Sequence, residues 1–426
     1  MNQIHLASLM SFSAKHTLKT LMIAIIVCCF SEANASQVRK VLLIGIDGCR
    51  SDALQQANTP TIDSLLGTSL YSNDSWHLGI TISGPSWSTI LTGTNWNKHG
   101  VKGNSYAGSN FNSYPYFTKR AKEIKPNLKC VEISEWAPLL NEVYNDGMDL
   151  KIKTDAGGDS TTAEALRQLQ DSSLDCLFTY YEAVDRAGHA SGFSTGNSAY
   201  INSIEYVDTQ MALLFQGLKN RVNYQHEDWL VLVVTDHGGV GLAHGGNSWA
   251  ERHIWWIASG TAINPGQIIA GDPGTYNFLA TGIFNSLGVN KNLMKQSPVQ
   301  ADIAVTALHH LIFDSGILPE NYPAWKLDGK SWLTNTIGIE AIENSSEFNL
   351  YPNPANEKIS INLSGTKNET IILNVYDLSG RLILAPQNNV SANLLEIDVS
   401  QLTSGTYLSK IQVGKKGYSK KFNVLH

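Results

Sequence analysis

A candidate nucleophile, Ser83, stands directly before Gly84-Pro85 and a short amphipathic run that ends at Gly93. This order predicts that the Ser83 hydroxyl lies at the start of a helix, where backbone N–H groups and the helix dipole favour an anionic ligand. A serine before Gly-Pro is also common in ordinary loops. The interpretation of Ser83 therefore depends on the side chains that other segments bring to it.

Carboxylate and imidazole side chains follow three apolar runs of the chain. Each run is continuous, which is typical of a strand buried on both faces of a parallel sheet. The carboxyl ends of such strands form the edge where open α/β sheets bind ligands. A single Asp there can be a helix N-cap, but the repetition predicts one shared site. The residues are Asp47 after residues 41–46, Asp185 and His189 after residues 177–181, and Asp236 and His237 after residues 229–235.

The types of these side chains indicate metal binding. Asp185 and His189 stand four positions apart and can chelate one cation from a tight turn. Asp236 and His237 offer one oxygen and one nitrogen ligand, a mixture that suits zinc or another borderline transition metal. A further imidazole, His244, precedes two glycines. Glycines beside these residues let the backbone pass close to a metal without a side-chain clash.

The elements that hold these residues predict an α/β fold. Residues 200–218 have the apolar spacing of an amphipathic helix, which we expect to be scaffold. Residues 106–117 are rich in aromatic side chains, which either line a substrate pocket or pack under a loop. With 426 residues, the chain is long enough for one large core and an appended unit. We expect the large domain to span residues 36–335.

Taken together, the motifs resemble the alkaline phosphatase superfamily, nearest its type I phosphodiesterase/nucleotide pyrophosphatase branch. The resemblance covers about residues 40 to 335 and implies a mostly parallel sheet flanked by helices. The resembling motifs are Asp47-Gly48, Ser83-Gly84-Pro85, Asp185 to His189, Asp236-His237-Gly238 and His244-Gly245-Gly246.

The resemblance implies two divalent cations, with zinc the favoured metal. In some relatives the third histidine lies further downstream, so His253 and His309 remain alternatives to His244. The implied ligands are Asp185, His189 and His244 for the first cation, and Asp47, Asp236, His237 and the Ser83 hydroxyl for the second.

Two cations about 4 Å apart can hold both the attacking and the leaving oxygen of a displacement at phosphorus. Ser83 then attacks as an alkoxide and forms a covalent phosphoseryl intermediate. Asn104 and Lys98 follow closely enough to hold other phosphate oxygens, with a structural role as the alternative for each. We expect a phosphoester hydrolase of the phosphodiesterase, nucleotide pyrophosphatase or phosphatase type.

Two other functions compete with this prediction. The first is a sulfatase, a type of enzyme that also resembles this superfamily. The nucleophile motif of sulfatases requires an arginine at the position where this chain has Trp87. Their calcium site also uses Asp-Asn where this chain has Asp236-His237, and an imidazole suits zinc better than calcium. A surface adhesin that keeps the fold without turnover is the non-enzymatic alternative, which the complete ligand sets disfavour. A net charge of −6 and the lack of a basic run disfavour nucleic-acid binding.

The N-terminus resembles an export signal. Lys15 and Lys19 precede the apolar residues 21–30, and Ala33-Asn34-Ala35 is a small-residue cleavage site. We predict a signal peptide over residues 1–35 and no transmembrane segment in the mature chain. A membrane anchor is the alternative, but about ten apolar residues are too short to span a bilayer. A lipoprotein signal is disfavoured because the usual residues before its cysteine are missing.

The mature chain keeps the cysteines Cys49, Cys130 and Cys176. An odd number without a Cys-x-x-Cys motif indicates neither a disulfide framework nor a thiolate zinc site. At most one bridge can form, and we expect buried free thiols.

A separate β-rich unit follows a polar linker over residues 336–347. Residues 348–426 contain short alternating runs and turn residues that predict a small β-sandwich. This unit resembles a type IX secretion sorting domain through its Tyr-Pro-Asn-Pro opening at residues 351–354 and its Asp-Leu-Ser-Gly-Arg turn at residues 377–381. The resemblance implies the type IX machinery as partner and secretion, through the periplasm, to the surface of a Gram-negative bacterium. A carbohydrate-binding module is the alternative.

Overall fold

The computed structural model describes residues 37–142, 147–268, 297–333, 350–362, 371–377, 382–384, 394–413 and 416–426. The chain divides into two compact units, one up to residue 334 and one from residue 335. The predicted signal peptide and linker lie outside the described residues. Within these ranges, no helix has the length and hydrophobicity that a membrane crossing requires.

The first unit is built on a mixed sheet of eight strands among the described residues. Strands β4, β3, β5, β1 and β6 run parallel, whereas β7 is antiparallel to both β6 and β2. This confirms the predicted mostly parallel sheet. In sheet order the strands are β4 (Leu150–Lys153), β3 (Lys129–Ser134), β5 (Leu174–Tyr181), β1 (Val38–Ile46), β6 (Glu227–Thr235), β7 (His253–Ser259), β2 (Ser69–Trp76) and β8 (Gly266–Gln267).

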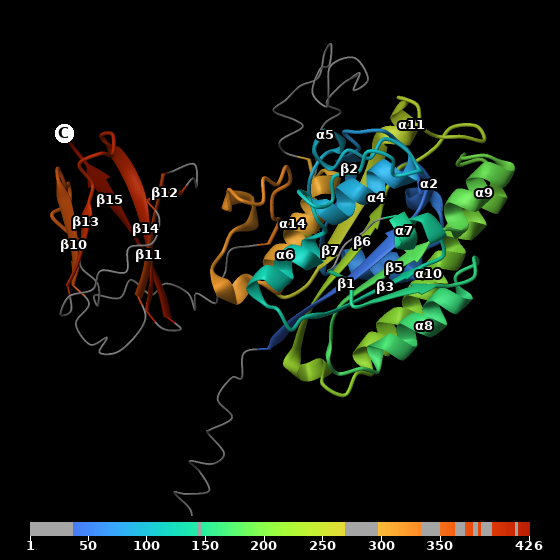
Figure 1. The fold of residues 1–426 in the computed structure, drawn as a ribbon, viewed down its shortest axis with the longest axis horizontal. Helices are drawn as coiled ribbons and strands as arrows, with labels where there is room; N and C mark the ends of the chain where they lie inside the picture. The colour runs from blue at the N-terminus through green and yellow to red at the C-terminus, as the bar shows by residue number, and fades with distance from the viewer. Residues whose placement is uncertain are drawn as a thin grey trace, which may run out of the picture. The chain divides into compact units, whose positions relative to one another are not determined.

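Helices cover both faces of this sheet, as Figure 1 shows for α6 and α14 on one side and α8 and α10 on the other. Each face has its own hydrophobic cluster, because side chains alternate along the strands: Leu43 packs in one cluster and Leu42 in the other. The helices are α2 (Ser51–Gln56), α3 (Pro60–Leu66), α4 (Ser83–Thr92), α5 (Trp96–His99), α6 (Phe117–Ile124), α7 (Ala137–Glu142), α8 (Asp159–Leu169), α9 (Ala183–Ser191), α10 (Ser198–Lys219), α11 (Trp249–Arg252) and α14 (Gln300–Leu311).

The register of the central strands explains where the polar residues meet. Ile46 of β1 is paired with Tyr181 of β5 on one side and with Thr235 of β6 on the other. The residues that follow these three strands therefore emerge together at one edge of the sheet. The continuous apolar runs fix this arrangement, since β6 is buried along its whole length.

The second unit consists of two small antiparallel sheets that share one hydrophobic cluster, which confirms a small C-terminal β-sandwich. One sheet has the order β13-β10-β9 and the other the order β12-β11-β14-β15. The strands are β9 (Leu350–Tyr351), β10 (Lys358–Asn362), β11 (Ile371–Asp377), β12 (Leu382–Leu384), β13 (Leu394–Asp398), β14 (Gly405–Val413) and β15 (Lys416–Val424).

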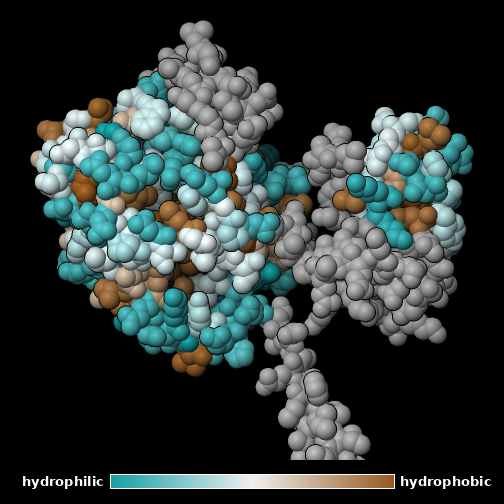
Figure 2. All heavy atoms as spheres, turned by 180° about the vertical axis from the view of Figure 1, so that it is seen from behind, coloured by the Kyte–Doolittle hydropathy of each residue, from teal (hydrophilic) through white to brown (hydrophobic). Residues whose placement is uncertain are grey.

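On the face drawn in Figure 2, hydrophobic residues of the described parts lie in small separate groups among hydrophilic ones. The cysteines of the described residues, Cys49, Cys130 and Cys176, are buried free thiols, as expected.

Candidate active site

Ser83 is the first residue of α4, as predicted, and its side chain is almost fully buried. Its Oγ lies 3.3 Å from His237 Nε2. Pro85 fits the first helical turn, where no backbone N–H donor is needed. Gly84 is required by a close approach, since a Cβ there would lie 2.7 Å from the carbonyl oxygen of Gly103. The Gly84 N–H instead donates to Asn104 Oδ1 at 2.8 Å, which holds the Asn104 amide beside the nucleophile.

Three carboxylates around Ser83 each have a buried oxygen without a hydrogen-bond partner: Asp47 Oδ1, Asp185 Oδ1 and Asp236 Oδ2. The other oxygen of Asp236 accepts the Gly48 N–H at 3.0 Å. Leaving a buried acceptor unpaired costs about 1–3 kcal/mol, and more when it is charged. Burial raises the pKa of all three carboxyls, that of Asp185 to about 9. A cation at the unpaired oxygens would remove this penalty.

The three histidines of the site all present Nε2 towards these carboxylates. Each ring places Nδ1 2.8–2.9 Å from a backbone carbonyl, which can only accept a hydrogen bond. Nδ1 therefore carries the proton, and the Nε2 lone pair is free to bind a metal. The pairs are His189 with Leu242, His237 with Gly238, and His244 with Thr81.

The ligand atoms form two adjacent groups. In the first, His189 Nε2 lies 3.4 Å from Asp185 Oδ2 and 3.1 Å from His244 Nε2. His244 Nε2 is also 3.7 Å from Asp185 Oδ1. In the second, His237 Nε2 lies 3.2 Å from Asp236 Oδ2 and 3.7 Å from Asp47 Oδ1.

The two groups join at His237, whose ring stacks on that of His244 with centroids 3.8 Å apart. The ligand atoms of Asp185, His237 and His244 lie within 4.8 Å of one another. Nitrogen lone pairs and carboxylate oxygens at these spacings repel each other unless a cation lies between them. The donor set, carboxylate and imidazole together, fits borderline divalent metals such as zinc.

One expectation about local structure was wrong. Asp185 and His189 do not lie in a tight turn but on helix α9, where residues four positions apart share a face. Gly188 between them packs against the Phe193 ring, which a Cβ would approach to 2.2 Å. The helix thus presents both ligands to the site.

Other candidates are engaged elsewhere. Lys98 forms an ion pair of 2.5 Å with Asp328, and its place at the substrate stays a prediction. His253 bonds Asp74 and His309 bonds Ser331, so the alternatives to His244 have partners of their own. Most aromatic side chains after the nucleophile helix pack in the core rather than line a pocket, namely Tyr106, Phe111, Tyr116 and Phe117.

Two residues that hydrogen-bond a proposed metal ligand were missed by sequence reasoning. Asp47 Oδ2 accepts hydrogen bonds from Trp87 Nε1 at 3.0 Å and from Tyr180 OH at 2.5 Å. A weak signal existed for Trp87, which lies four residues after Ser83 and therefore on the same face of α4. Tyr180 gave no signal, because it reads as one more apolar residue of its strand.

A cavity of about 640 Å³ opens beside the first ligand group. Its walls are mainly residues of α9, including three alanines together with Asp185 and His189, and Glu182 also lines it. Arg186 also lines it, exposed and without a side-chain hydrogen bond or ion pair to any residue that the structure describes.

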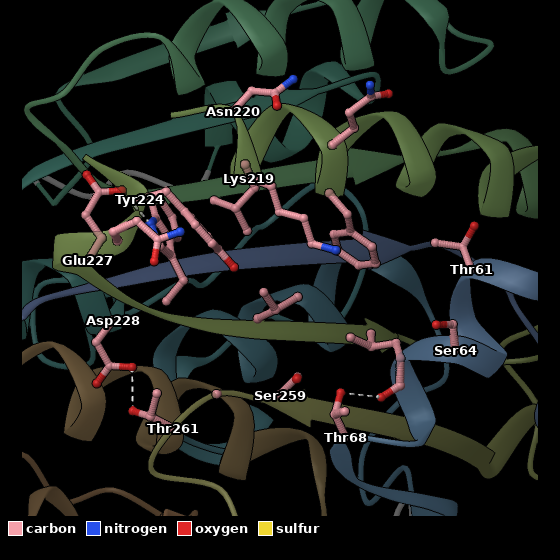
Figure 3. Close-up of a pocket in the computed structure, with 18 of the residues that line it drawn as sticks. Thr61, Ser64, Thr68, Lys219, Asn220, Tyr224, Glu227, Asp228, Ser259 and Thr261 are labelled. Atoms are coloured by element: carbon pink, nitrogen blue, oxygen red, sulfur yellow. Dashed lines mark hydrogen bonds between the residues drawn. The ribbon is translucent and has the colours of Figure 1, made fainter. Parts of the chain in front are cut away.

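A larger cavity, about 960 Å³, contains none of these site residues. It lies between α3, the end of α10 and the start of β6, at the amino-terminal end of that strand. Figure 3 shows its polar rim, with Thr261 bonded to Asp228 at 2.6 Å. It is therefore separate from the candidate active site.

In comparisons with known proteins, each of the two units matches a protein family. Residues 41–148 and 130–277 match the type I phosphodiesterase / nucleotide pyrophosphatase family. Residues 349–424 match the secretion system C-terminal sorting domain. No curated protein sequence matches the chain.

Similar solved structures include murine ectonucleotide pyrophosphatase/phosphodiesterase 5, 15% identical, covering 64% of this chain and 95% of that chain, with a TM-score of 0.47. The phosphonate monoester hydrolase of Silicibacter pomeroyi is 13% identical, with 90% and 89% coverage and a TM-score of 0.47. A 2-O GAG sulfatase is 12% identical, with 90% and 82% coverage and a TM-score of 0.49.

Proposed function

The chain belongs to the type I phosphodiesterase/nucleotide pyrophosphatase family, and we propose that it is an exported phosphoester hydrolase with Ser83 as nucleophile and two divalent cations, preferably zinc. The observation that carries this proposal is the set of unpaired oxygens and Nε2 lone pairs gathered beside the Ser83 hydroxyl. The proposed ligands are Asp185, His189 and His244 for one cation, and Asp47, Asp236, His237 and Ser83 for the other.

When bound, the cations would supply positive charge to the attacking and leaving oxygens and to the phosphoryl group. Ser83 Oγ, after losing its proton to solvent, forms a bond to phosphorus while the bond to the ester oxygen breaks. The departing alkoxide takes a proton from water. Water then attacks the phosphoseryl group, which releases phosphate or its monoester and restores the Ser83 hydroxyl.

The residues next to Ser83 are suited to hold the other phosphate oxygens. The side-chain carbonyl oxygen of Asn104 accepts a hydrogen bond from the Gly84 N–H, which fixes the amide. The NH₂ group of Asn104 is then left to donate to an anion. The start of α4 adds its favourable dipole. This arrangement supports Asn104, rather than the ion-paired Lys98, as the phosphate ligand.

We place the remainder of the substrate in the cavity along α9. The small side chains there leave room for a group, and Arg186 offers a guanidinium to a second negative charge on that group. A substrate with two anionic groups would use both this arginine and the cations.

The test is a panel of matched nitrophenyl esters: a phosphomonoester, a phosphodiester and a sulfate. We expect phosphoester turnover that is lost on chelation and restored by zinc, with two metal equivalents in the active protein. Turnover of the sulfate ester above that of both phosphoesters, or formylglycine at residue 83 in peptide mass spectra, would instead favour the sulfatase.

The C-terminal unit supports the predicted destination. Since residues 349–424 match a secretion-system sorting domain, we propose export through the periplasm and type IX secretion to the cell surface or medium.

A further inference from the structure

Among the contacts between described residues, Asp47 is the only one of the three site carboxylates that accepts two side-chain hydrogen bonds at one oxygen. Trp87 Nε1 and Tyr180 OH both bond Oδ2, and all three side chains are buried. Oδ1 has no partner and faces His237 Nε2. The two oxygens of one carboxylate therefore have different surroundings.

The fold keeps these two donors in place. Tyr180 of β5 is paired in register with Gly45 of β1, two residues before Asp47. Gly45 makes room for the Trp87 indole, since a Cβ there would lie 2.4 Å from a ring atom. The rings of Trp87 and Tyr180 pack edge to face with centroids 5.3 Å apart. Trp136 also stacks on Tyr180, with ring centroids 6.3 Å apart.

Both donors suit a carboxylate oxygen, which can only accept a hydrogen bond. The indole N–H of Trp87 has no acceptor role, and the Tyr180 O–H bonds the same oxygen. They therefore present a pair of donors to Asp47 Oδ2.

We propose that Tyr180 and Trp87 are positioning residues, which occupy Asp47 Oδ2 and so reserve Oδ1 for a cation of the second ligand group. The inference rests on the proposed function. With Oδ2 occupied, Asp47 binds through one oxygen at a fixed angle. Without the donors, the carboxylate can rotate and Oδ2 competes for the cation.

The decisive variant is Tyr180→Phe, which removes one hydroxyl and keeps the ring. The chain offers a matched control in Tyr181→Phe. Tyr181 is the next residue of the same strand, is equally buried and donates or accepts one hydrogen bond with Thr162 at 2.8 Å, but it packs in the cluster on the opposite face. Both variants lose one buried hydroxyl, and only the Tyr180 hydroxyl contacts the Asp47 carboxylate. The backbone carbonyl of Tyr181 accepts the Asp47 N–H at 3.0 Å, a bond that the substitution keeps.

The readout is zinc affinity, measured by competition with a chromogenic chelator on the full mature protein. We expect Tyr180→Phe to weaken one of two zinc equivalents by about 10–100-fold, whereas Tyr181→Phe stays within about twofold of wild type. Asp47→Ala should affect the same equivalent. Trp87→Phe, where it folds, should act on that equivalent as Tyr180→Phe does.

Unchanged zinc affinity in Tyr180→Phe would overturn the inference, and so would an equal loss in both tyrosine variants. These results differ from a failure of the proposed function itself, in which the wild-type protein would bind no divalent cation or hydrolyse no phosphoester.

Discussion

At the scale of single residues, the main feature of the candidate site is its buried negative charge. Asp47, Asp185 and Asp236 bring three carboxylates into a region where water is largely excluded. Together with the Ser83 alkoxide they would carry four negative charges, which two divalent cations balance. Neutral imidazoles complete the ligand sets without adding charge. The composition of the site thus matches two divalent cations better than one.

Removal of the nucleophile is the most direct test at this scale. Ser83→Ala should lower kcat by at least about 1,000-fold, because the covalent step is lost. It should keep both metal equivalents, since each retains three protein ligands. Kinetics with a nitrophenyl phosphodiester and elemental analysis measure the two effects.

Ser88→Ala is a suitable control. Ser88 is a buried serine of the same helix, and its hydroxyl donates a hydrogen bond to the Gly84 carbonyl oxygen within that helix. Near wild-type activity in Ser83→Ala would show that another hydroxyl attacks.

A second prediction concerns Glu132, a buried residue of β3 that lies outside the site. Neither of its carboxylate oxygens has a hydrogen-bond partner among the described residues. Burial raises its pKa to about 8, against a partial lowering by Lys151. The folded state therefore holds a proton that the unfolded state releases above pH about 4.5. The contribution of Glu132 to the free energy of unfolding is fully present below that pH and is lost as pH rises towards 8, by up to about 1.4 kcal/mol per pH unit.

Glu132→Gln should remove this dependence. The free energy of unfolding of the variant, relative to wild type, should increase from pH 5 to pH 8. Denaturation followed by tryptophan fluorescence measures the first unit alone, because all 10 tryptophans lie between residues 76 and 332. The same difference between the two proteins at both pH values would contradict the prediction.

At the scale of elements, the site depends on strands β1, β5 and β6 ending side by side. This was predictable from sequence, because continuous apolar runs indicate buried parallel strands and such strands end at one edge. The helical state of α9 was not predicted, although alanines favour helix there. The donors to Asp47 were also missed, since Trp87 is 40 and Tyr180 is 133 residues away in sequence. Such contacts arise from packing, and the only local signal was the weak one that Trp87 lies four residues after Ser83.

Helix α9 also carries the proposed substrate contact. Arg186→Ala should raise KM about 10-fold for an aryl ester of a nucleoside 5′-phosphate that bears an additional 3′-phosphate, because a charged hydrogen bond is lost. The same ester without the 3′-phosphate should be little affected. Arg167→Ala is the control, since Arg167 is an exposed arginine that pairs with Glu164 on α8. Equal changes for both esters would argue against a contact with the second anion.

At the scale of the whole molecule, the two units divide the proposed tasks. Every proposed ligand and the nucleophile lie between residues 47 and 244, within the first unit. The second unit has its own hydrophobic cluster, which contains no residue before Leu350. Catalysis and sorting should therefore be separable by truncation.

The point of truncation matters, because the first unit extends to Thr334, well beyond the end of α14 at Leu311. Leu333 is buried in the main cluster and Trp332 packs against it, while Trp332 Nε1 also donates to Asp302. A mature chain that ends at Thr334 should keep kcat/KM within about twofold of the full mature chain. A chain that ends at Lys330 should lose stability, because it exposes this part of the core.

In the native host, the chain that ends at Thr334 should accumulate in the periplasm, whereas the full chain reaches the surface or the medium. Fractionation followed by the phosphodiesterase assay measures location and activity together. Among the described residues, the proposed ligands, the nucleophile and the two clusters on either face of the large sheet all belong to the first unit. A shortened chain that folds with its usual tryptophan fluorescence but has lost turnover would show that the C-terminal unit takes part in the active site.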